Sequence, residues 1–399
     1  MFAGIAIVGS ACTAPPEGAE APLRSVDGLP AVDHGDRLLV LTEDGSVVTT
    51  DPDGASRIVI RPGGTQGVAA RQPVWSPDST TIAWVELGTG GPPATSTLVT
   101  PRRDGSDRTE VEVDTAMFFL GWDPTSSRVV YLGSYGPAIG MGVAERAEGG
   151  RPVAQTLAVG RPFYLSWAPD GETLFVHVGT ESLGSVDLEG ELRPVGDDPG
   201  RFQAPVWIAD GRLFYATADG GRQALVVREG DRISELVRFR GRIEFVVSPD
   251  GDRLAYRVDT RSRPGGLTVL RIGSGRSDRV TEAAVTAFHW SPDGRTLLLM
   301  TPEGSEEVPR MHRWRLWDGR RLRTVGPAFV PSSAYLEDYV PFFGQYAQTM
   351  TLWAPDGSAF AFPGLVAERT GIWVQRLDAD EPRLVIEGGA VVAWSPGTA

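Results

Sequence analysis

The chain has 399 residues, a formal net charge of −13 and a single cysteine, Cys12. Acidic residues scattered through predicted turns argue against nucleic acid or an anionic membrane surface as a partner. One cysteine excludes an internal disulfide, so the fold must depend on packing.

The first twelve residues form an apolar run that ends in small residues and reaches Cys12. Such a run is too short to span a bilayer, which needs about 20 residues, but it is typical of the end of a secretory signal. It resembles the end of a bacterial lipoprotein signal, which implies that Cys12 is lipidated and that the protein lies outside the cytoplasmic membrane. The alternative is an unprocessed start. Residues 13–35 are rich in Pro, Ala, Gly and acids and predict a flexible tether to a single domain over residues 36–399.

One motif recurs along that domain: a strand ending in Trp, a Ser-Pro-Asp-Gly turn, and a second apolar strand. Pro presets the backbone at the first corner of such a turn, Asp can bond its own backbone, and Gly accepts positive φ. Successive anchors are mostly 40 to 47 residues apart, which leaves room for four strands in each copy. This period predicts the blades of a β-propeller. The anchors are Trp75, Trp122, Trp167, Trp207, Val247, Trp290, Trp353 and Trp394.

The two ends of the domain complete each other in this scheme. Residues 37–42, 46–50 and 57–60 predict three strands of a blade without its first strand, and residues 390–394 predict a first strand alone. We therefore expect an all-β, eight-bladed propeller of four-stranded antiparallel blades, in which both termini share one blade and two exposed sheet edges disappear. Seven blades is the alternative if one weaker repeat is misread.

The repeated Trp-Ser-Pro-Asp-Gly motif, followed by strands such as Arg253-Leu254-Ala255-Tyr256 and Ala359-Phe360-Ala361-Phe362, resembles the TolB-like propeller repeat. The same repeat occurs in the propellers of prolyl oligopeptidase and dipeptidyl peptidase IV relatives. The resemblance covers residue 37 to the C-terminus and implies a non-catalytic binding platform outside the cytoplasmic membrane. It implies no particular partner, because the motif residues build hairpins and propellers support unrelated functions.

The sequence offers no recognisable catalytic or metal motif. A peptidase of the oligopeptidase type needs Gly-x-Ser-x-Gly, which does not occur in the chain. The four histidines, His34, His177, His289 and His312, have no short ligand spacing, so neither a metal nor another cofactor is expected. We predict that the protein is not an enzyme. The alternative is a carbohydrate-active enzyme, a glycosidase or lyase, whose carboxylates meet at the mouth of the channel.

Long connections are predicted on one face of the disc only, and the longest is an insertion at residues 327–348 that contains six aromatic residues. Loops concentrated on one side of a rigid scaffold often carry binding residues, and Tyr is enriched at recognition surfaces. We expect an unknown protein or envelope glycan to bind there, with the chain a monomer and an acidic rim favouring a basic or polar partner. The alternative is that the rings plug the central channel. The predicted binding residues are Tyr135, Glu306, Glu307, Tyr335, Asp338, Tyr339, Phe342, Phe343 and Tyr346.

Overall fold

The structure is a computed structural model that describes residues 35–88, 95–145, 153–160, 163–179, 182–201, 203–259, 265–304 and 311–397. All of these belong to one unit, Gly35–Ala399. Cys12, Glu306 and Glu307, on which three of the predictions fall, lie outside the described residues. No helix among the described residues is long and apolar enough to cross a membrane.

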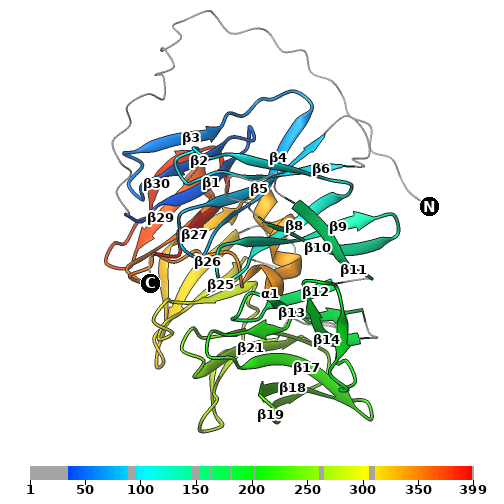
Figure 1. Cartoon of the computed structure of the whole chain (residues 1–399). Helices are drawn as coiled ribbons and strands as arrows, with labels where there is room; N and C mark the ends of the chain where they lie inside the picture. Colours follow the sequence, from blue (N-terminus) through cyan, green and yellow to red (C-terminus); the bar gives the residue numbers. More distant parts are fainter. Residues whose placement is uncertain are drawn as a thin grey trace, which may run out of the picture. The chain divides into compact units, whose positions relative to one another are not determined.

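The described residues form a nearly all-β structure whose strand pairs are antiparallel (Figure 1). Alternating buried and exposed residues on the outer strands, and fully buried inner strands such as β12, place the core between neighbouring sheets. Six sheets contain four strands each, in the pairing orders β3(Arg57–Arg61)-β2(Val47–Thr50)-β1(Leu38–Thr42)-β31(Gly389–Trp394), β4(Val68–Trp75)-β5(Ile82–Gly88)-β6(Ser96–Thr100)-β7(Thr109–Val113), β8(Ala116–Trp122)-β9(Arg128–Tyr135)-β10(Ala138–Glu145)-β11(Val153–Gly160), β12(Phe163–Trp167)-β13(Thr173–Val178)-β14(Ser182–Asp187)-β15(Leu192–Pro194), β16(Val206–Trp207)-β17(Leu213–Asp219)-β18(Arg222–Glu229)-β19(Arg232–Phe239) and β20(Arg242–Val247)-β21(Arg253–Asp259)-β22(Leu267–Arg271)-β23(Arg276–Thr281).

The last two repeats differ from the expected pattern because they join into one seven-stranded sheet. Its order is β24(Ala287–Trp290)-β25(Leu297–Glu303)-β26(Met311–Trp317)-β27(Leu322–Pro331)-β28(Ala359–Val366)-β29(Arg369–Arg376)-β30(Arg383–Glu387). The ten-residue β27 ends at Val330 and Pro331, which pair with Leu365 and Gly364 of β28. The predicted first strand of the final repeat is reduced to a bridge between Trp353 and Phe360.

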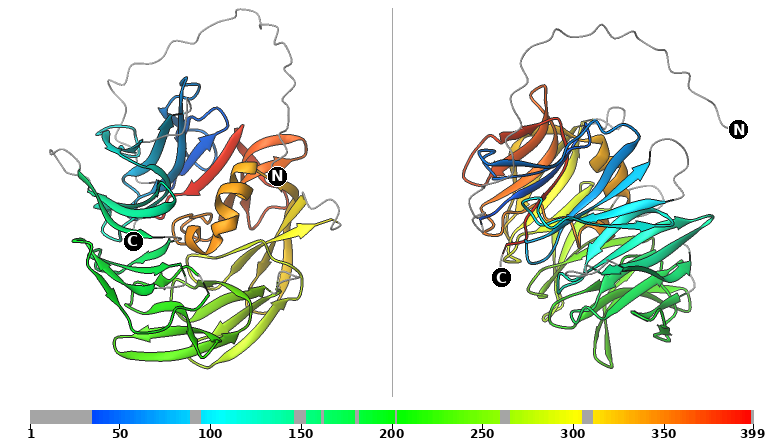
Figure 2. Two further views of the ribbon diagram at one scale, coloured as in Figure 1. Left: turned by 90° about the vertical axis from the view of Figure 1, so that its right-hand side faces the viewer. Right: turned by 45° about the horizontal axis from the view of Figure 1, so that its top comes forward.

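Strands from the two ends of the domain pair with each other. β1 runs antiparallel to β31, with Leu38 opposite Trp394, and the two strands lie side by side in both views of Figure 2. Ser395 donates its N–H to the Arg37 carbonyl at 2.8 Å, and the Arg37 N–H donates to Ser395 Oγ at 3.0 Å. Within one continuous hairpin, Ser76 makes the same two bonds with Thr81. Arg37 therefore occupies, beside Ser395, the position that Thr81 occupies beside Ser76, although Arg37 comes from the other end of the domain.

The anchor tryptophans connect neighbouring sheets. The indole N–H of Trp75 donates to the Ala393 carbonyl at 3.1 Å, and that of Trp290 donates to the Val246 carbonyl at 3.1 Å. Trp167 and Trp353 bond the preceding repeat in the same way. In each case the acceptor directly precedes the anchor of the preceding repeat. At these four junctions the bond satisfies the buried indole N–H while the ring fixes the spacing of the sheets.

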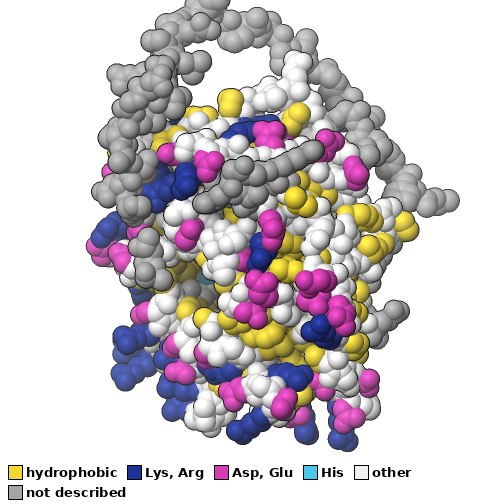
Figure 3. Space-filling model, in the orientation of Figure 1, with side chains coloured by type: hydrophobic (Ala, Val, Ile, Leu, Met, Phe, Trp, Pro, Cys, Tyr) yellow, Lys and Arg dark blue, Asp and Glu magenta, His cyan; other side chains and the backbone are white. Residues whose placement is uncertain are grey.

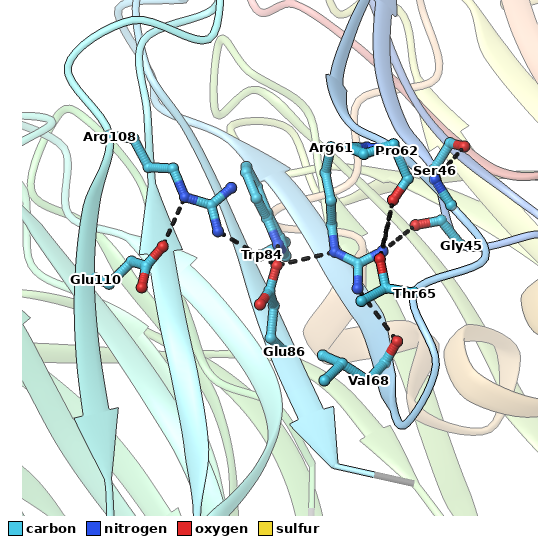
Figure 4. Close-up of polar contacts among 11 residues, drawn as sticks. Gly45, Ser46, Arg61, Pro62, Thr65, Val68, Trp84, Glu86, Arg108 and Glu110 are labelled. Atoms are coloured by element: carbon cyan, nitrogen blue, oxygen red, sulfur yellow. Dashed lines mark hydrogen bonds and ion pairs between the residues drawn. The ribbon is translucent and has the colours of Figure 1, made fainter.

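An arginine network joins the outer strand of the terminal sheet to the next sheet (Figure 4). Arg61 on β3 is buried, donates to Glu86 Oε1 on β5 at 2.9 Å, and donates to the Gly45 carbonyl at 2.7 Å. Glu86 Oε1 also accepts the Trp84 indole N–H at 3.2 Å, and Arg108 lies over the Trp84 ring. Burial alone would raise the pKa of Glu86, but these hydrogen bonds and the arginine charges hold the pKa below its ordinary value.

The insertion folds into three short helical pieces: η1 (Tyr335–Tyr339), η2 (Val340–Phe342) and α1 (Phe343–Tyr346). We refer to residues 335–351, which contain them, as the central segment. In Figure 2 (left) this orange segment lies in the middle of the surrounding strands. Four of its aromatic rings belong to the main hydrophobic core, which also contains residues of β4, β8, β12 and β24.

Candidate functional site

The central segment contains most of the predicted binding residues, and most of them are buried. Tyr335, Tyr339, Phe343 and Tyr346 are 3–5% exposed, whereas Phe342 is 51% exposed. A side chain buried this deeply contacts the rest of its own chain rather than a partner at the surface. The burial therefore favours the alternative in which the rings fill the channel, and Phe342 is the ring left available to solvent.

Ring contacts explain how the interior is filled. Phe343 packs against Phe288, with ring centroids 4.9 Å apart, and against His289 at 5.5 Å. Tyr346 packs against Phe119 at 5.3 Å and against Tyr339 at 4.6 Å. The remaining space among these rings is a cavity of about 10 Å³, at or below what one water needs. The centre is thus a packed core.

Polar bonds tie the central segment to the first strands of the surrounding sheets. Gln345 accepts the Leu165 N–H at 2.8 Å and donates to the Leu165 carbonyl at 2.9 Å, so its amide pairs with β12 like a neighbouring strand. The Tyr346 hydroxyl donates to the Phe118 carbonyl of β8 at 3.0 Å. Further bonds and ion pairs join Asp338 to Arg71, Pro341 to Arg242, Gln348 to Pro205 and Thr351 to Trp394.

Burial also favours the neutral form of four titratable groups in this region. It raises the pKa of the Tyr335, Tyr339 and Tyr346 hydroxyls and lowers the pKa of His289 to about 4. The Tyr339 hydroxyl and His289 Nε2 have no hydrogen-bond partner among the described residues.

Two other predicted binding residues lie nearer the surface. Tyr135, at the end of β9, is half-buried; its hydroxyl lies 2.6 Å from Thr156 Oγ1, and its ring covers Gly140 so closely that a side chain there would collide with it. Asp338 is half-buried and forms an ion pair with Arg71 at 3.4 Å, which neutralises part of the expected acidic rim. The structure therefore separates Tyr135 from the buried rings of the central segment.

Two apolar cavities open beside the central segment, on the face that carries the Ser-Pro-Asp-Gly turns. Their volumes are about 400 and 340 Å³, and both are lined by Val246, Val247 and Ala347. Tryptophans of the first strands form their walls and exposed turn prolines form their rims. Besides the three shared residues, the lining residues include Pro77, Trp122, Pro124, Trp167, Val206, Trp207 and Gln348 in the first cavity and Pro249, His289, Trp290, Pro292, Trp353 and Pro396 in the second.

The sequence predicts a binding surface on the opposite, loop-rich face and does not predict these cavities. The signal is present in the sequence, because a proline stands two residues after every anchor except Trp207. Those prolines were used only to predict turns. Since Pro77, Pro124, Pro249 and Pro292 are exposed at the end of each first strand, the same residues that form the hairpins also form an apolar rim.

The carboxylates that an enzyme would need do not meet in these cavities, since neither lining contains Asp or Glu. Two carboxyls, Asp123 and Glu244, are deeply buried among the described residues that neighbour the linings. Glu244 on β20 pairs through Oε1 with Arg242, and its Oε2 has no partner among the described residues. Burial raises the pKa of Glu244 despite the nearby arginines. No group of three or more His, Cys, Asp or Glu in the described part of the chain is arranged to hold a metal.

Comparison with known proteins extends to structure only. No protein-family model matches the chain, and no curated protein matches its sequence. The β-propeller domain of the Trilobed protease from Pyrococcus furiosus is 12% identical over 81% of this chain and 99% of that one, with a TM-score of 0.51. A prolyl endopeptidase is 11% identical over 82% of this chain and 50% of that one, with a TM-score of 0.54. TolB from Acinetobacter baumannii is 16% identical over 75% of this chain and 86% of that one, with a TM-score of 0.42.

Likeness at this level of identity shows the fold alone, and the fold is that of a β-propeller. The predicted propeller architecture is thereby confirmed. At 11–12% identity, the likeness to the protease domain and to the prolyl endopeptidase does not decide between a binding protein and an enzyme. The Trilobed protease domain has an open velcro topology. In this chain, by contrast, β1 pairs with β31.

Proposed function

We propose that this protein is a non-catalytic binding scaffold, an eight-bladed propeller that holds an apolar segment of a partner protein or an envelope ligand. The eight blades are the six four-stranded sheets and two further blades within the seven-stranded sheet. The second of these takes residues 351–353 as its first strand, because Ala354 and Ala359 close a hairpin there with a 2.9 Å hydrogen bond. The pairing of β1 with β31 supports closure of the ring.

The observation that carries the proposal is the composition of the two cavities. They combine apolar walls with a few polar side chains, such as Gln348, Thr349 and Thr351, and their volumes fall within the usual range for ligand sites. Neither lining has the pair of carboxylates that glycoside hydrolysis requires. This combination supports binding rather than chemistry.

The loop-rich face remains a second candidate surface. Phe342 is exposed there, and Asp338 and Tyr135 reach the surface in part. In this version of the proposal, the buried tyrosines would support the position of Phe342 rather than contact the partner themselves.

The chain would act outside the cytoplasmic membrane through a lipid at Cys12, and it would act as a monomer. Failure of Cys12→Ser to abolish labelling by radioactive palmitate would contradict the anchor.

Substitutions that introduce charged residues at the rims of the two apolar cavities test the proposal. Pro124→Glu combined with Pro249→Glu places two carboxylates at the rim, and we expect it to abolish both Nile red fluorescence and partner capture from an envelope extract. Pro52→Glu is the matched control, because Pro52 lies in an equivalent Asp-Pro-Asp-Gly turn and lines neither cavity. Capture that survives in the double variant but is lost in Phe342→Asp would move the binding surface to the loop-rich face.

A further inference from the structure

A second hollow, separate from the apolar cavities, is lined by arginines. It has a volume of about 660 Å³, and its eight lining residues include four arginines and no carboxylate. In a chain of net charge −13, such a local excess of positive charge runs against the average composition. The lining residues are Arg201, Gly221, Arg222, Gln223, Arg238, Phe239, Arg240 and Gly241. We call this hollow the arginine pocket.

Three chain segments meet to form the arginine pocket. The turn from β17 to β18 contains Gly220 and Gly221, both at positive φ, and delivers Arg222 to the rim. Gln223 on β18 is opposite Phe239, the last residue of β19, and Arg240 follows directly. Gln223 Oε1 accepts the backbone N–H of Arg201 at 2.7 Å, which holds the third segment in place. The pocket is therefore built from strand ends and backbone bonds rather than from a free loop.

Most of the positive charge of the arginine pocket is not compensated. Arg238 forms an ion pair with Glu235 at 2.7 Å. The guanidinium groups of Arg201, Arg222 and Arg240 form no ion pair with any described residue, and all three side chains are exposed. By comparison, the exposed Arg376 pairs with Asp378, a carboxylate close in sequence. In Figure 3, dark-blue and magenta side chains both lie along the lower edge, where β18 and β19 lie in Figure 1.

We propose that the arginine pocket binds a phosphate-bearing ligand. A guanidinium presents a planar fork of donors that matches phosphate oxygens, and several forks around one hollow favour a multiply charged anion. The volume falls in the range of small-molecule sites and leaves room for more than one phosphate group, while the buried Phe239 supplies one apolar wall. The acidity of the remaining surface disfavours a long polyanion such as nucleic acid.

The arginine pocket is independent of the proposed scaffold cavity. It lies at the connections from β17 to β18 and from β19 to β20, on the loop-rich face, whereas the apolar cavities lie on the face of the Ser-Pro-Asp-Gly turns. The linings of the arginine pocket and of the two apolar cavities share no residue. A ligand at one site can therefore be tested without disturbing the other.

Titration calorimetry of the full chain with sodium tripolyphosphate at low salt tests the proposal. We expect Arg222→Gln combined with Arg240→Gln to weaken binding about tenfold or more, since each lost charge-assisted hydrogen bond is typically worth about that factor. Arg320→Gln combined with Arg321→Gln is the matched control, because it removes the same charge from exposed arginines of the turn before β27. Thermal unfolding checks that both variants remain folded.

The outcomes separate the possible sources of the phosphate group. Binding of tripolyphosphate together with flotation of the wild type, but not of the Arg222/Arg240 variant, on phosphatidylglycerol vesicles would assign the pocket to a lipid headgroup. Binding of tripolyphosphate without flotation would assign it to a soluble phosphate compound. An absence of tripolyphosphate binding to the wild type, or an equal loss in the control variant, would overturn the proposal.

Discussion

The exposure of the central segment and of the arginine pocket is the reverse of what their residue types suggest. The central segment is rich in tyrosine and phenylalanine, the composition of many recognition surfaces, yet its rings are buried against β8 and β24. The arginine pocket arises from ordinary turns and strand ends, yet it leaves three guanidinium groups exposed around one hollow. The comparison teaches that burial, rather than residue type, decides whether a cluster of side chains packs in the core or stays exposed to solvent.

Adjacent phenylalanines in the central segment give the largest expected contrast. Phe343→Ala removes a buried ring that contacts Phe288 and His289, and we expect it to lower the free energy of unfolding by about 3–5 kcal/mol. Phe342→Ala, one residue earlier, removes a half-exposed ring and should change the free energy by about 0.5 kcal/mol or less. Urea unfolding followed by tryptophan fluorescence measures both. Equal effects would mean that the segment does not fill the core.

A second pair of variants compares the hydrogen bonds of a glutamine in the central segment with those of a glutamine in the arginine pocket. Gln345→Ala leaves the Leu165 N–H and carbonyl without their amide partner in a buried setting, so we expect a loss of about 2–4 kcal/mol in the free energy of unfolding. Gln223→Ala removes an amide of the same type at the exposed arginine pocket, where water can replace the bond to Arg201. The same urea unfolding experiment should show a loss of about 1 kcal/mol or less there. A smaller loss for Gln345→Ala than for Gln223→Ala would contradict the assignment of Gln345 as a core anchor.

The propeller could be predicted because its information is local and repeated. Trp290, Ser291 and Gly294 specify a hairpin by themselves, and the spacing of such hairpins specifies the sheets. The joining of β27 to β28 could not be predicted, since it depends on how far β27 extends past its partner.

The candidate sites could not be predicted, because they depend on contacts between residues that are far apart in the sequence. The arginine pocket unites residues 201, 222 and 240, whose meeting depends on strand register. The apolar cavities unite residues of several first strands with Ala347 of the central segment, whose meeting depends on the tertiary fold. Neither contact has a pattern within the sequence.

Substitutions of Glu86 and Glu244 give the smallest expected effects on the free energy of unfolding. The two carboxyls depend on pH with opposite signs. The pKa of Glu86 is held below its ordinary value, so its contribution to stability is present above that value and is lost as pH falls through the lowered pKa. The pKa of Glu244 is raised by burial, so its contribution is present below the ordinary value and is lost as pH rises through the raised pKa.

At neutral pH we therefore expect Glu86→Gln to destabilise the protein by about 1–3 kcal/mol, because the charged acceptor of Arg61 is lost. Glu244→Gln should leave the stability equal or higher, because it removes a buried charge whose partner Arg242 is about half exposed. As pH falls from 7, unfolding free energies should bring Glu244→Gln toward the wild type first, because the raised pKa of Glu244 is reached at the higher pH. Glu86→Gln should approach the wild type only below the ordinary carboxyl pKa, because the pKa of Glu86 is lowered. A large destabilisation by Glu244→Gln at pH 7 would mean that the Glu244 carboxylate is fully paired, as Glu86 is, and that its unpartnered oxygen is not a source of strain.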